Sequence, residues 1–345
     1  MTAAEQRPGL AERFLRFGER ECVPSSPLYA ELSRTVANDE ELLSLAAETP
    51  EAQPAPNLLF AAVHFLLRRK PRNALASFYP SLTSNPQPPA AAPEPFRAFC
   101  AARRESIVEL LHTRAVGTNE VARCACLYPA FLAAMDEAGA RRVHFFEIGA
   151  SAGLTLLWPR YGYDYGRGRT VPDDAAAPVI RCELKGGNPP LTLDRSRLGR
   201  IAGIDLQPMN LADENDADWL QALIWPEQSD RRARLAAAID FARQTGVTVA
   251  KGDGIEAVPA FAAGLADGEA LCVVHSFTLN QISEALRRKL DDHLAGVSRL
   301  RPVFRVAMEW NRAAVDLALI AYDPQPKPRL LAHADAHGRW LDWLI

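Results

Sequence analysis

The sequence predicts an α/β protein in which a mostly parallel sheet follows an N-terminal helical region. Up to about residue 140, apolar residues recur at three- and four-residue spacing, as on one face of a helix. Beyond it, short apolar runs rich in β-branched and aromatic residues alternate with helical stretches, which is typical of a parallel sheet. The 345 residues also exceed the size at which one core usually stops growing. We therefore expect a helical region over residues 1–140 and a sheet domain over 141–345.

The helical region is predicted from six segments with helical periodicity. A proline-rich run over residues 85–93 interrupts them, and we interpret it as a loop because successive prolines remove backbone donors. The predicted helices are Leu10–Arg20, Pro27–Asn38, Glu40–Ala47, Asn57–Arg69, Phe96–Leu111 and Asn119–Ala138.

The sheet domain is predicted from five apolar runs with helices between them. An antiparallel pair is expected at the sheet edge, because two further apolar segments flank the turn-rich sequence Asp323-Pro-Gln-Pro326. The predicted strands are Arg142–Ile148, Ile201–Leu206, Val247–Lys251, Ala270–Ser276, Val303–Glu309, Asp316–Tyr322 and Arg329–His333, and the helices are Trp219–Thr245 and Ile282–Arg299.

Composition narrows the classes of function. The chain has 39 basic and 42 acidic residues, a formal net charge of −3, with 48% apolar and 23% charged residues. These values are ordinary for a globular protein and argue against a disordered or coiled-coil chain. They also argue against nucleic acid as a partner, since such proteins usually carry an excess of Lys and Arg on one face. Composition does not predict the oligomeric state.

The N-terminal sequence and the cysteines indicate a cytoplasmic protein. The first residues lack the basic start and apolar stretch of a secretory signal. The most apolar early window, Leu58–Leu67, is about half the length that spans a bilayer, so no membrane segment is predicted. Six cysteines are sparse for this length and are interpreted as reduced thiols. Cys124 and Cys126 have no second pair to complete a zinc site, and no metal is predicted.

A glycine-containing turn is the most informative segment. The strand that ends Glu147-Ile148 leads directly into Gly149-Ala-Ser-Ala-Gly153 and a predicted helix. Glycine permits positive φ and lets a ligand approach the backbone, while the start of a helix presents unpaired amides. Two interpretations stay open: a cofactor-binding turn, or a tight connection that binds nothing.

Acidic residues follow two later strands. Asp205 comes after one apolar run and Asp253 after another. Open α/β sheets bind ligands beyond the carboxyl ends of their strands, so Glu147, Asp205 and Asp253 are expected to converge there. A carboxylate can accept hydrogen bonds from ribose hydroxyls or from an exocyclic amine.

The arrangement resembles the class I S-adenosylmethionine-dependent methyltransferases, whose first motif, an acid followed by spaced glycines, is similar to Glu147 through Gly153. The resemblance implies a Rossmann-like sheet, S-adenosylmethionine as cofactor and a small-molecule acceptor. It places Gly149 and Gly153 at the methionine end, Asp205 at the ribose and Asp253 at the adenine. Glu147 and Ser151 are predicted to bind the cofactor as well. Asp205 follows Gly153 by 52 residues, more than one helix requires, which predicts an insertion at about 161–193. We interpret this insertion as a hairpin over the pocket, with Tyr163 contacting substrate.

Nearly end to end, the chain also resembles a bacterial family known as domain of unknown function 2332. That resemblance names no reaction, so function must be argued from residues. The segments that carry it are Ser26–Tyr29, Thr118–Arg123, Glu147–Leu154, Gly203–Leu206, Trp225–Glu227 and His337–Trp340.

Polar residues between two predicted helices have two open interpretations. Thr118 is a plausible N-cap, and the surrounding polar residues then serve only the helix start. Alternatively Arg114 and Asn119 contact the substrate, with Arg114 pairing with a carboxylate, and Glu120 takes part in catalysis.

His275, at the end of the fourth strand, and Glu309, after the fifth, are the other candidate catalytic residues. An unperturbed histidine pKa near 6.5 suits a general base. A histidine that only satisfies backbone groups is an equally good interpretation.

Two other site types need weighing. His333, Asp335 and His337 would share one face of a strand, but no fourth ligand is apparent and no metal is expected. Gly149-Ala-Ser151-Ala-Gly153 also fits the Gly-x-Ser-x-Gly elbow of α/β-hydrolases. Asp253 or another acid, with His275, His333 or His337, would then complete a triad. We rank a hydrolase lower because its elbow follows a middle strand, whereas helices precede this one. A non-catalytic nucleotide-binding protein is the third alternative.

Overall fold

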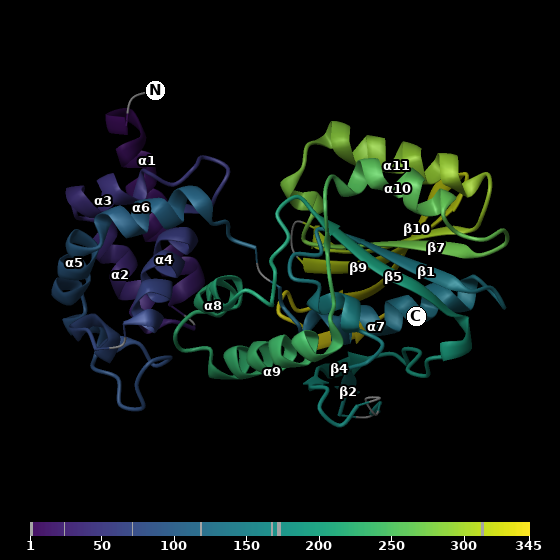
Figure 1. Ribbon diagram of the computed structural model, residues 1–345, viewed down its shortest axis with the longest axis horizontal. Helices are drawn as coiled ribbons and strands as arrows, with labels where there is room; N and C mark the ends of the chain where they lie inside the picture. The colour runs from purple at the N-terminus through teal and green to yellow at the C-terminus, as the bar shows by residue number, and fades with distance from the viewer. Residues whose placement is uncertain are drawn as a thin grey trace. The chain divides into compact units, whose positions relative to one another are not determined.

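The computed structural model describes residues 3–23, 25–70, 72–117, 119–166, 168–170, 174–311 and 314–345. It confirms a mixed α/β protein with a large, mostly parallel sheet. The chain divides into two compact units, which Figure 1 shows: Met1–Thr118 with Asp213–Ala236, and Asn119–Ala212 with Ala237–Ile345. The helix after residue 119, predicted as the last of the helical region, belongs to the second unit because it packs on the sheet.

The first unit is helical, and its core is aromatic. The ring of Phe60 lies 4.6 Å from that of Tyr29, measured between centroids, and 5.9 Å from that of Phe14. Its helices are α1 (Ala3–Phe17), α2 (Pro27–Ala37), α3 (Glu40–Ala46), α4 (Ala55–Arg69), α5 (Pro93–Ala102), α6 (Arg104–Thr113) and α8 (Glu214–Ala222), and α9 (Ser229–Thr245) runs from this unit into the second.

The returning segment 213–236 is tied into the first unit by specific polar contacts. The indole Nε1 of Trp219 donates to the carbonyl oxygen of Ala115 at 3.0 Å. The carboxylate of Glu227 accepts from Ser26 Oγ at 2.6 Å and from the backbone N–H of Leu28 at 2.9 Å. Glu227 therefore satisfies donors at the N-terminus of α2, where negative charge is favourable.

The second unit contains a nine-stranded sheet in the order β4-β11-β10-β9-β8-β7-β1-β5-β6 and a separate two-stranded sheet, β2-β3. The strands are β1 (Val143–Ile148), β2 (Gly162–Asp164), β3 (Val179–Arg181), β4 (Glu183–Gly186), β5 (Leu198–Asp205), β6 (Ala250–Lys251), β7 (Ala270–Ser276), β8 (Val303–Asn311), β9 (Ala314–Asp323), β10 (Gln325–Ala334) and β11 (Trp340–Trp343).

The order of the parallel strands creates a switch point beside β1. Five neighbouring strands of the sheet pair in parallel, in the spatial order β6, β5, β1, β7, β8. Numbered by their order along the chain, these five parallel strands are the third, second, first, fourth and fifth. The chain thus builds outward from β1 first to one side and then to the other. Open α/β sheets bind ligands outside the carboxyl ends of the strands at such a point. We call this side of the sheet the carboxyl edge.

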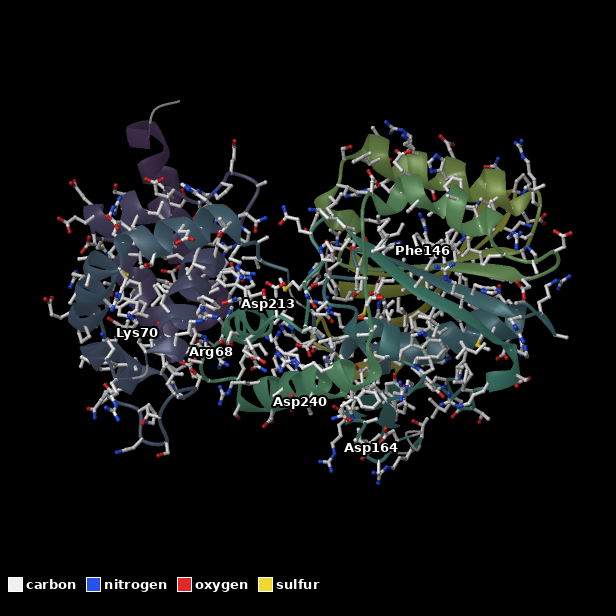
Figure 2. All side chains as sticks on the ribbon, viewed as in Figure 1. Arg68, Lys70, Phe146, Asp164, Asp213 and Asp240 are labelled. Atoms are coloured by element: carbon white, nitrogen blue, oxygen red, sulfur yellow. The ribbon has the colours of Figure 1, made fainter. Side chains whose placement is uncertain are left out.

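Helices cover both faces of the sheet, as Figure 1 shows. α10 (Gly254–Ala263) and α11 (Glu284–Ser298) lie on one face, and α7 (Arg123–Glu137) lies on the other. Phe146, labelled in Figure 2, points from β1 toward α10, where its ring stacks on Phe261 with centroids 4.5 Å apart. Burial on both faces explains why the central strands read as continuous apolar runs.

Among its described residues, the insertion contains only a short antiparallel bridge, between Asp164 and Arg169, and is not a single hairpin as predicted. β2 and β3 pair in parallel, and β4 joins the main sheet beside β11. Its tyrosines are buried rather than exposed. The hydroxyl of Tyr163 donates to the Trp158 carbonyl at 2.6 Å, and that of Tyr165 to the Ala125 carbonyl of α7 at 2.7 Å. The aromatic run therefore packs into the core.

Candidate functional site

The glycine turn, Gly149–Gly153, connects β1 to a short 3-10 helix. Gly149 and Gly153 have φ of 77° and 75°, and Ser151 has φ of 52°, a value that non-glycine residues rarely adopt. The N–H of Gly149 donates to the Ile204 carbonyl of β5 at 2.9 Å. The α-helix predicted after the turn is only Leu154–Leu157, so the turn offers little of a helix N-terminus.

Protein atoms fill the space beside these glycines. A Cβ on Gly149 would lie 2.6 Å from Thr278 Oγ1, and one on Gly153 would lie 2.8 Å from Val249 Cγ2. The neighbouring strand shows the same restriction, because a Cβ on Gly203 would meet Ala150 Cβ at 2.6 Å. Close packing and positive φ thus account for the glycines, and a ligand has to be argued from other residues.

Two acids lie at the glycine turn. Asp205, at the end of β5, accepts from the Ser151 N–H at 2.8 Å and from the Gln207 N–H at 2.9 Å. Glu147, at the end of β1, is buried. The third predicted acid, Asp253, is the N-cap of α10 and accepts from the Ile255 N–H at 2.8 Å.

The carboxyl group of Glu147 is held in an unusual environment. Burial raises its pKa to about 8; the Thr155 hydroxyl opposes the shift and the charge of Asp205 adds to it. Its Oε2 atom is buried with no hydrogen-bond partner. Native structures rarely leave such an oxygen unsatisfied, so it indicates a place where a ligand donor or a water is expected.

Two further buried polar atoms near Glu147 lack a partner: Asn119 Oδ1 and Ser276 Oγ. Asn119 is next to the turn, since its Nδ2 donates to the Ala150 carbonyl at 3.1 Å. Ser276 lies two residues beyond Val274, which pairs with Glu147, so both side chains project from the same face of the sheet. Glu147 and Ser276 therefore share a sheet face on the neighbouring strands β1 and β7, and Asn119 contacts the turn that follows β1.

His275 and Glu309 form a buried pair on the opposite face. His275 lies two residues beyond Val273 on β7, so the two side chains project from the same face of the sheet. Val273 packs in the core beneath α10 and α11. His275 Nδ1 lies 2.7 Å from Glu309 Oε1, which also accepts from the N–H groups of Thr278 and Leu279 at 3.0 Å. Burial lowers the pKa of His275 despite the Glu309 carboxylate. The pair positions the loop after β7, and a catalytic role stays a prediction.

The segments around Glu120 and His337 meet at the carboxyl edge. Glu120 is buried and accepts from the Ala122 N–H at 3.2 Å, and its Oε2 lies 3.8 Å from His337 Nδ1. A Cβ on Gly338 would lie 2.3 Å from the Ala122 carbonyl, so only glycine allows this approach.

The residues weighed as a metal site have other partners. His333 Nδ1 lies 2.9 Å from Asp316 Oδ1, and Asp335 binds Arg339 at 2.8 Å. Across the described residues, no cluster of three or more His, Cys, Asp or Glu side chains could hold a metal ion.

Sequence reasoning did not single out Arg123, at the start of α7. Its Nε donates to the Ala336 carbonyl at 2.8 Å, and its charge acts on the Glu147 carboxyl group. The signal was present, because Arg123 ends one of the segments that carry the family resemblance.

The remaining predicted residues are not brought to this edge by any described contact. Arg114 belongs to the helical unit and pairs with Asp216. Tyr163 is fully buried in the core. Thr118 lies outside the described residues, so its capping role is not addressed.

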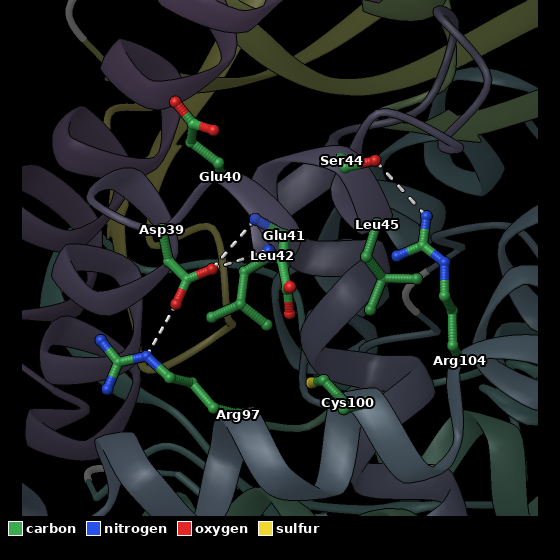
Figure 3. A pocket seen from close by; sticks show the side chains of 10 residues that line it. Asp39, Glu40, Glu41, Leu42, Ser44, Leu45, Arg97, Cys100 and Arg104 are labelled. Carbon is green, nitrogen blue, oxygen red and sulfur yellow. Dashed lines mark hydrogen bonds and ion pairs between the residues drawn. The ribbon is translucent and has the colours of Figure 1, made fainter.

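The helical unit has a hollow of about 520 Å³ between α3 and α5, shown in Figure 3. Three of its charged side chains, Asp39, Arg97 and Arg104, bind other protein groups. Asp39 caps α3 and lies 2.7 Å from Arg97 Nε, while Arg104 donates to Ser44 Oγ at 3.4 Å. Burial acts to raise the pKa of Asp39, but the bonds from the Leu42 N–H and Arg97 lower it overall. These contacts stabilise the unit and indicate no ligand.

The fold and this edge define a mixed α/β protein with a polar candidate site at a sheet switch point. The chain belongs to the family described as an uncharacterized protein conserved in bacteria (DUF2332), which matches residues 11–343. No curated protein and no solved structure matches the chain. Within the described ranges, no helix is long and apolar enough to cross a membrane.

The segments that carry the family resemblance meet in pairs in the structure. Ser26 contacts Glu227, Ser151 contacts Asp205, and Gly338 contacts Ala122. The first pair lies in the helical unit and the other two lie at the carboxyl edge.

Proposed function

We propose that this protein is a Rossmann-like, S-adenosylmethionine-dependent methyltransferase acting on a small molecule. The observation that carries the proposal is the pair of carboxyl groups, Glu147 and Asp205, at a strand-to-turn junction beside the switch point. Strand order supports it as well, because the order third-second-first-fourth-fifth is that of nucleotide-binding sheets.

The charge at the turn favours a cationic ligand over a dinucleotide. A pyrophosphate is bound by the amides of a helix N-terminus, which a four-residue 3-10 helix supplies poorly. Asp205 would also repel its negative charges, as would Glu147 wherever it is ionised. S-adenosylmethionine instead carries a sulfonium and an ammonium group, which carboxylates attract.

The residues take distinct roles in this proposal. Asp205 accepts from the ribose hydroxyls with lone pairs that its two backbone bonds leave free, and Asp253 lies near the adenine. Glu147 and Asn119 accept from the ammonium group through the oxygens that have no protein partner. The cofactor supplies an activated methyl group, and the protein holds the acceptor in line with it, so positioning does most of the catalytic work.

Calorimetry with S-adenosylhomocysteine tests the proposal. We expect the wild type to bind it and to melt at a higher temperature when saturated, because ligand bound only to the folded state stabilises it. Asp205→Ala should weaken binding about ten- to a hundredfold, the effect of losing a hydrogen bond to a charged acceptor.

The controls separate binding from folding. Asp205 also holds the Ser151 N–H, so Asp205→Asn, which keeps an acceptor oxygen, should fold and bind with intermediate affinity. Asp267→Ala, at an exposed turn, should bind like the wild type. Absence of binding to the wild type, tighter binding of NAD, or full affinity in Asp205→Ala would each refute the proposal.

A serine hydrolase is the second candidate, and the backbone of Ser151 favours it. Its φ of 52° within Gly-x-Ser-x-Gly matches the strained nucleophile turn of that class. Against it, β1 is the first strand along the chain, and His275 projects from the opposite face to Glu147. Labelling by a fluorophosphonate probe that is lost in Ser151→Ala would establish the hydrolase and exclude methyl transfer.

A further inference from the structure

Phe277 is held in a strained conformation at the carboxyl edge. Its φ is 56°, a conformation that is unfavourable for a bulky residue and persists only where the surroundings enforce it. The surroundings do so here: its N–H donates to the Met308 carbonyl at 2.9 Å, and its carbonyl accepts from Gln281 Nε2 at 2.6 Å. Glu309 fixes the next residues by accepting from the Thr278 N–H. Strain of this kind concentrates at functional sites.

The strained backbone aims the Phe277 ring at two side chains. The guanidinium carbon of Arg123 lies 4.1 Å from the centre of the ring. Trp310, at the end of β8, meets the same ring edge-on, with centroids 6.1 Å apart and an interplanar angle of 73°. Trp310 lies two residues beyond Met308 on β8 and therefore shares its face of the sheet. Met308 pairs with Ser276, which is on the same face as Glu147, so Trp310 projects from the face that carries Glu147.

Trp310 is 55% exposed, although it is the largest side chain of the cluster and lies beside a fixed aromatic neighbour. Phe277 contacts the indole, yet more than half of the Trp310 side chain remains open to solvent. Aromatic rings prefer offset-stacked or edge-to-face partners, and the free part of the indole offers one such position.

We propose that Trp310 and Phe277 bind a planar aromatic ring, and that the methyl acceptor is an aromatic small molecule. This inference rests on the proposed function. Asp205 and Trp310 end strands β5 and β8, which are three strand spacings apart, or about 14 Å. A cofactor with its ribose at Asp205 would extend its reactive end toward β1 and β7, on the side of Trp310.

A matched pair of probes tests the inference: 2-naphthol, which is planar, and 2-decalol, which has the same carbon framework and hydroxyl but is not. Binding is measured by calorimetry with and without saturating S-adenosylhomocysteine. We expect the wild type to bind 2-naphthol about two- to tenfold more tightly than 2-decalol, the range of an aromatic pair. Trp310→Leu should remove this preference and leave the affinity for S-adenosylhomocysteine unchanged. Leu300→Ala, at another exposed apolar position, should keep the preference.

The outcomes separate this inference from the proposed function. Equal binding of the two probes by the wild type, or a preference that survives in Trp310→Leu, overturns the aromatic site. If the wild type does not bind S-adenosylhomocysteine but Trp310→Leu still loses the 2-naphthol preference, the ring site stands and the methyltransferase proposal fails. Trp310 is exposed, so its substitution should leave the melting temperature nearly unchanged.

Discussion

The free energy of unfolding should depend on pH through Glu147, and Glu147→Gln isolates that dependence. Burial holds the pKa of this carboxyl group at about 8 in the folded protein, against 4.5 for an ordinary glutamate. Between these two values the folded state binds more protons than the unfolded state. The free energy of unfolding therefore falls as pH rises from 4.5 to 8.

The size of the effect follows from the two pKa values. From pH 5.5 to 7.5, ionisation of Glu147 in the unfolded state lowers the free energy of unfolding by about 2–3 kcal/mol. Glutamine keeps the shape of the side chain but cannot ionise. The difference in free energy of unfolding, Glu147→Gln minus wild type, should thus grow by that amount over the same range.

Urea unfolding at several pH values measures the difference, and subtraction cancels the other titrating groups. Asp267→Asn, at an exposed turn, controls for the change of charge. A difference that stays constant with pH would show that Glu147 ionises normally, and would remove the buried acid from the argument. S-adenosylhomocysteine adds a second measurement: its affinity should rise with pH for the wild type, because its ammonium group favours the ionised carboxylate, and should not rise in Glu147→Gln.

Three other variants test the packing around the site and in the helical unit. Gly149→Ala should lower the free energy of unfolding by about 1–3 kcal/mol, because the added methyl group overpacks against Thr278. Thr278→Ala in the same chain should restore part of this stability in thermal melts, and no recovery would contradict the contact. Tyr163→Phe should lower the free energy of unfolding by about 1 kcal/mol, because it removes the hydrogen bond from the tyrosine hydroxyl. The affinity for S-adenosylhomocysteine should be unchanged, and weaker binding would show that Tyr163 contributes to the site. Glu227→Gln should lower the free energy of unfolding by about 1–2 kcal/mol, because it weakens the contacts with Ser26 and α2. An unchanged urea midpoint would show that these contacts do not contribute to stability.

Local sequence pattern predicted most of the central strands. β7 occupies the predicted range Ala270–Ser276, and β1, β5 and β8 differ from prediction by a few residues at their ends. These strands are buried on both faces, so their apolar runs are a direct consequence of position. The antiparallel pair of β9 and β10 was also predicted from its turn, but its predicted place at the sheet edge is wrong, because β11 and β4 lie beyond β10.

Elements without a strong local pattern were not predicted. β4 and β11 pair with each other although about 150 residues separate them, and neither is long enough to show a periodicity. The helix predicted over Trp219–Thr245 is broken into α8 and α9, consistent with Pro226 disfavouring helix at the residue before it. The strand predicted over Val247–Lys251 is reduced to two residues at the sheet edge.

The sequence by itself determined the α/β class, the turn after β1 and the acids that follow the strands, because these depend on short-range patterns of apolar residues, glycine and charge. Only the tertiary structure decided which of the candidate residues lie on the same face of the sheet and in contact with the turn. Strand alternation puts Glu147 and His275 on opposite faces. The packing of residues 119–123 on the sheet brings Asn119 to the turn and Arg123 to the Phe277 ring. The same long-range packing exposes Trp310 beside Phe277, since the face and neighbours of a side chain depend on register and on contacts between distant segments.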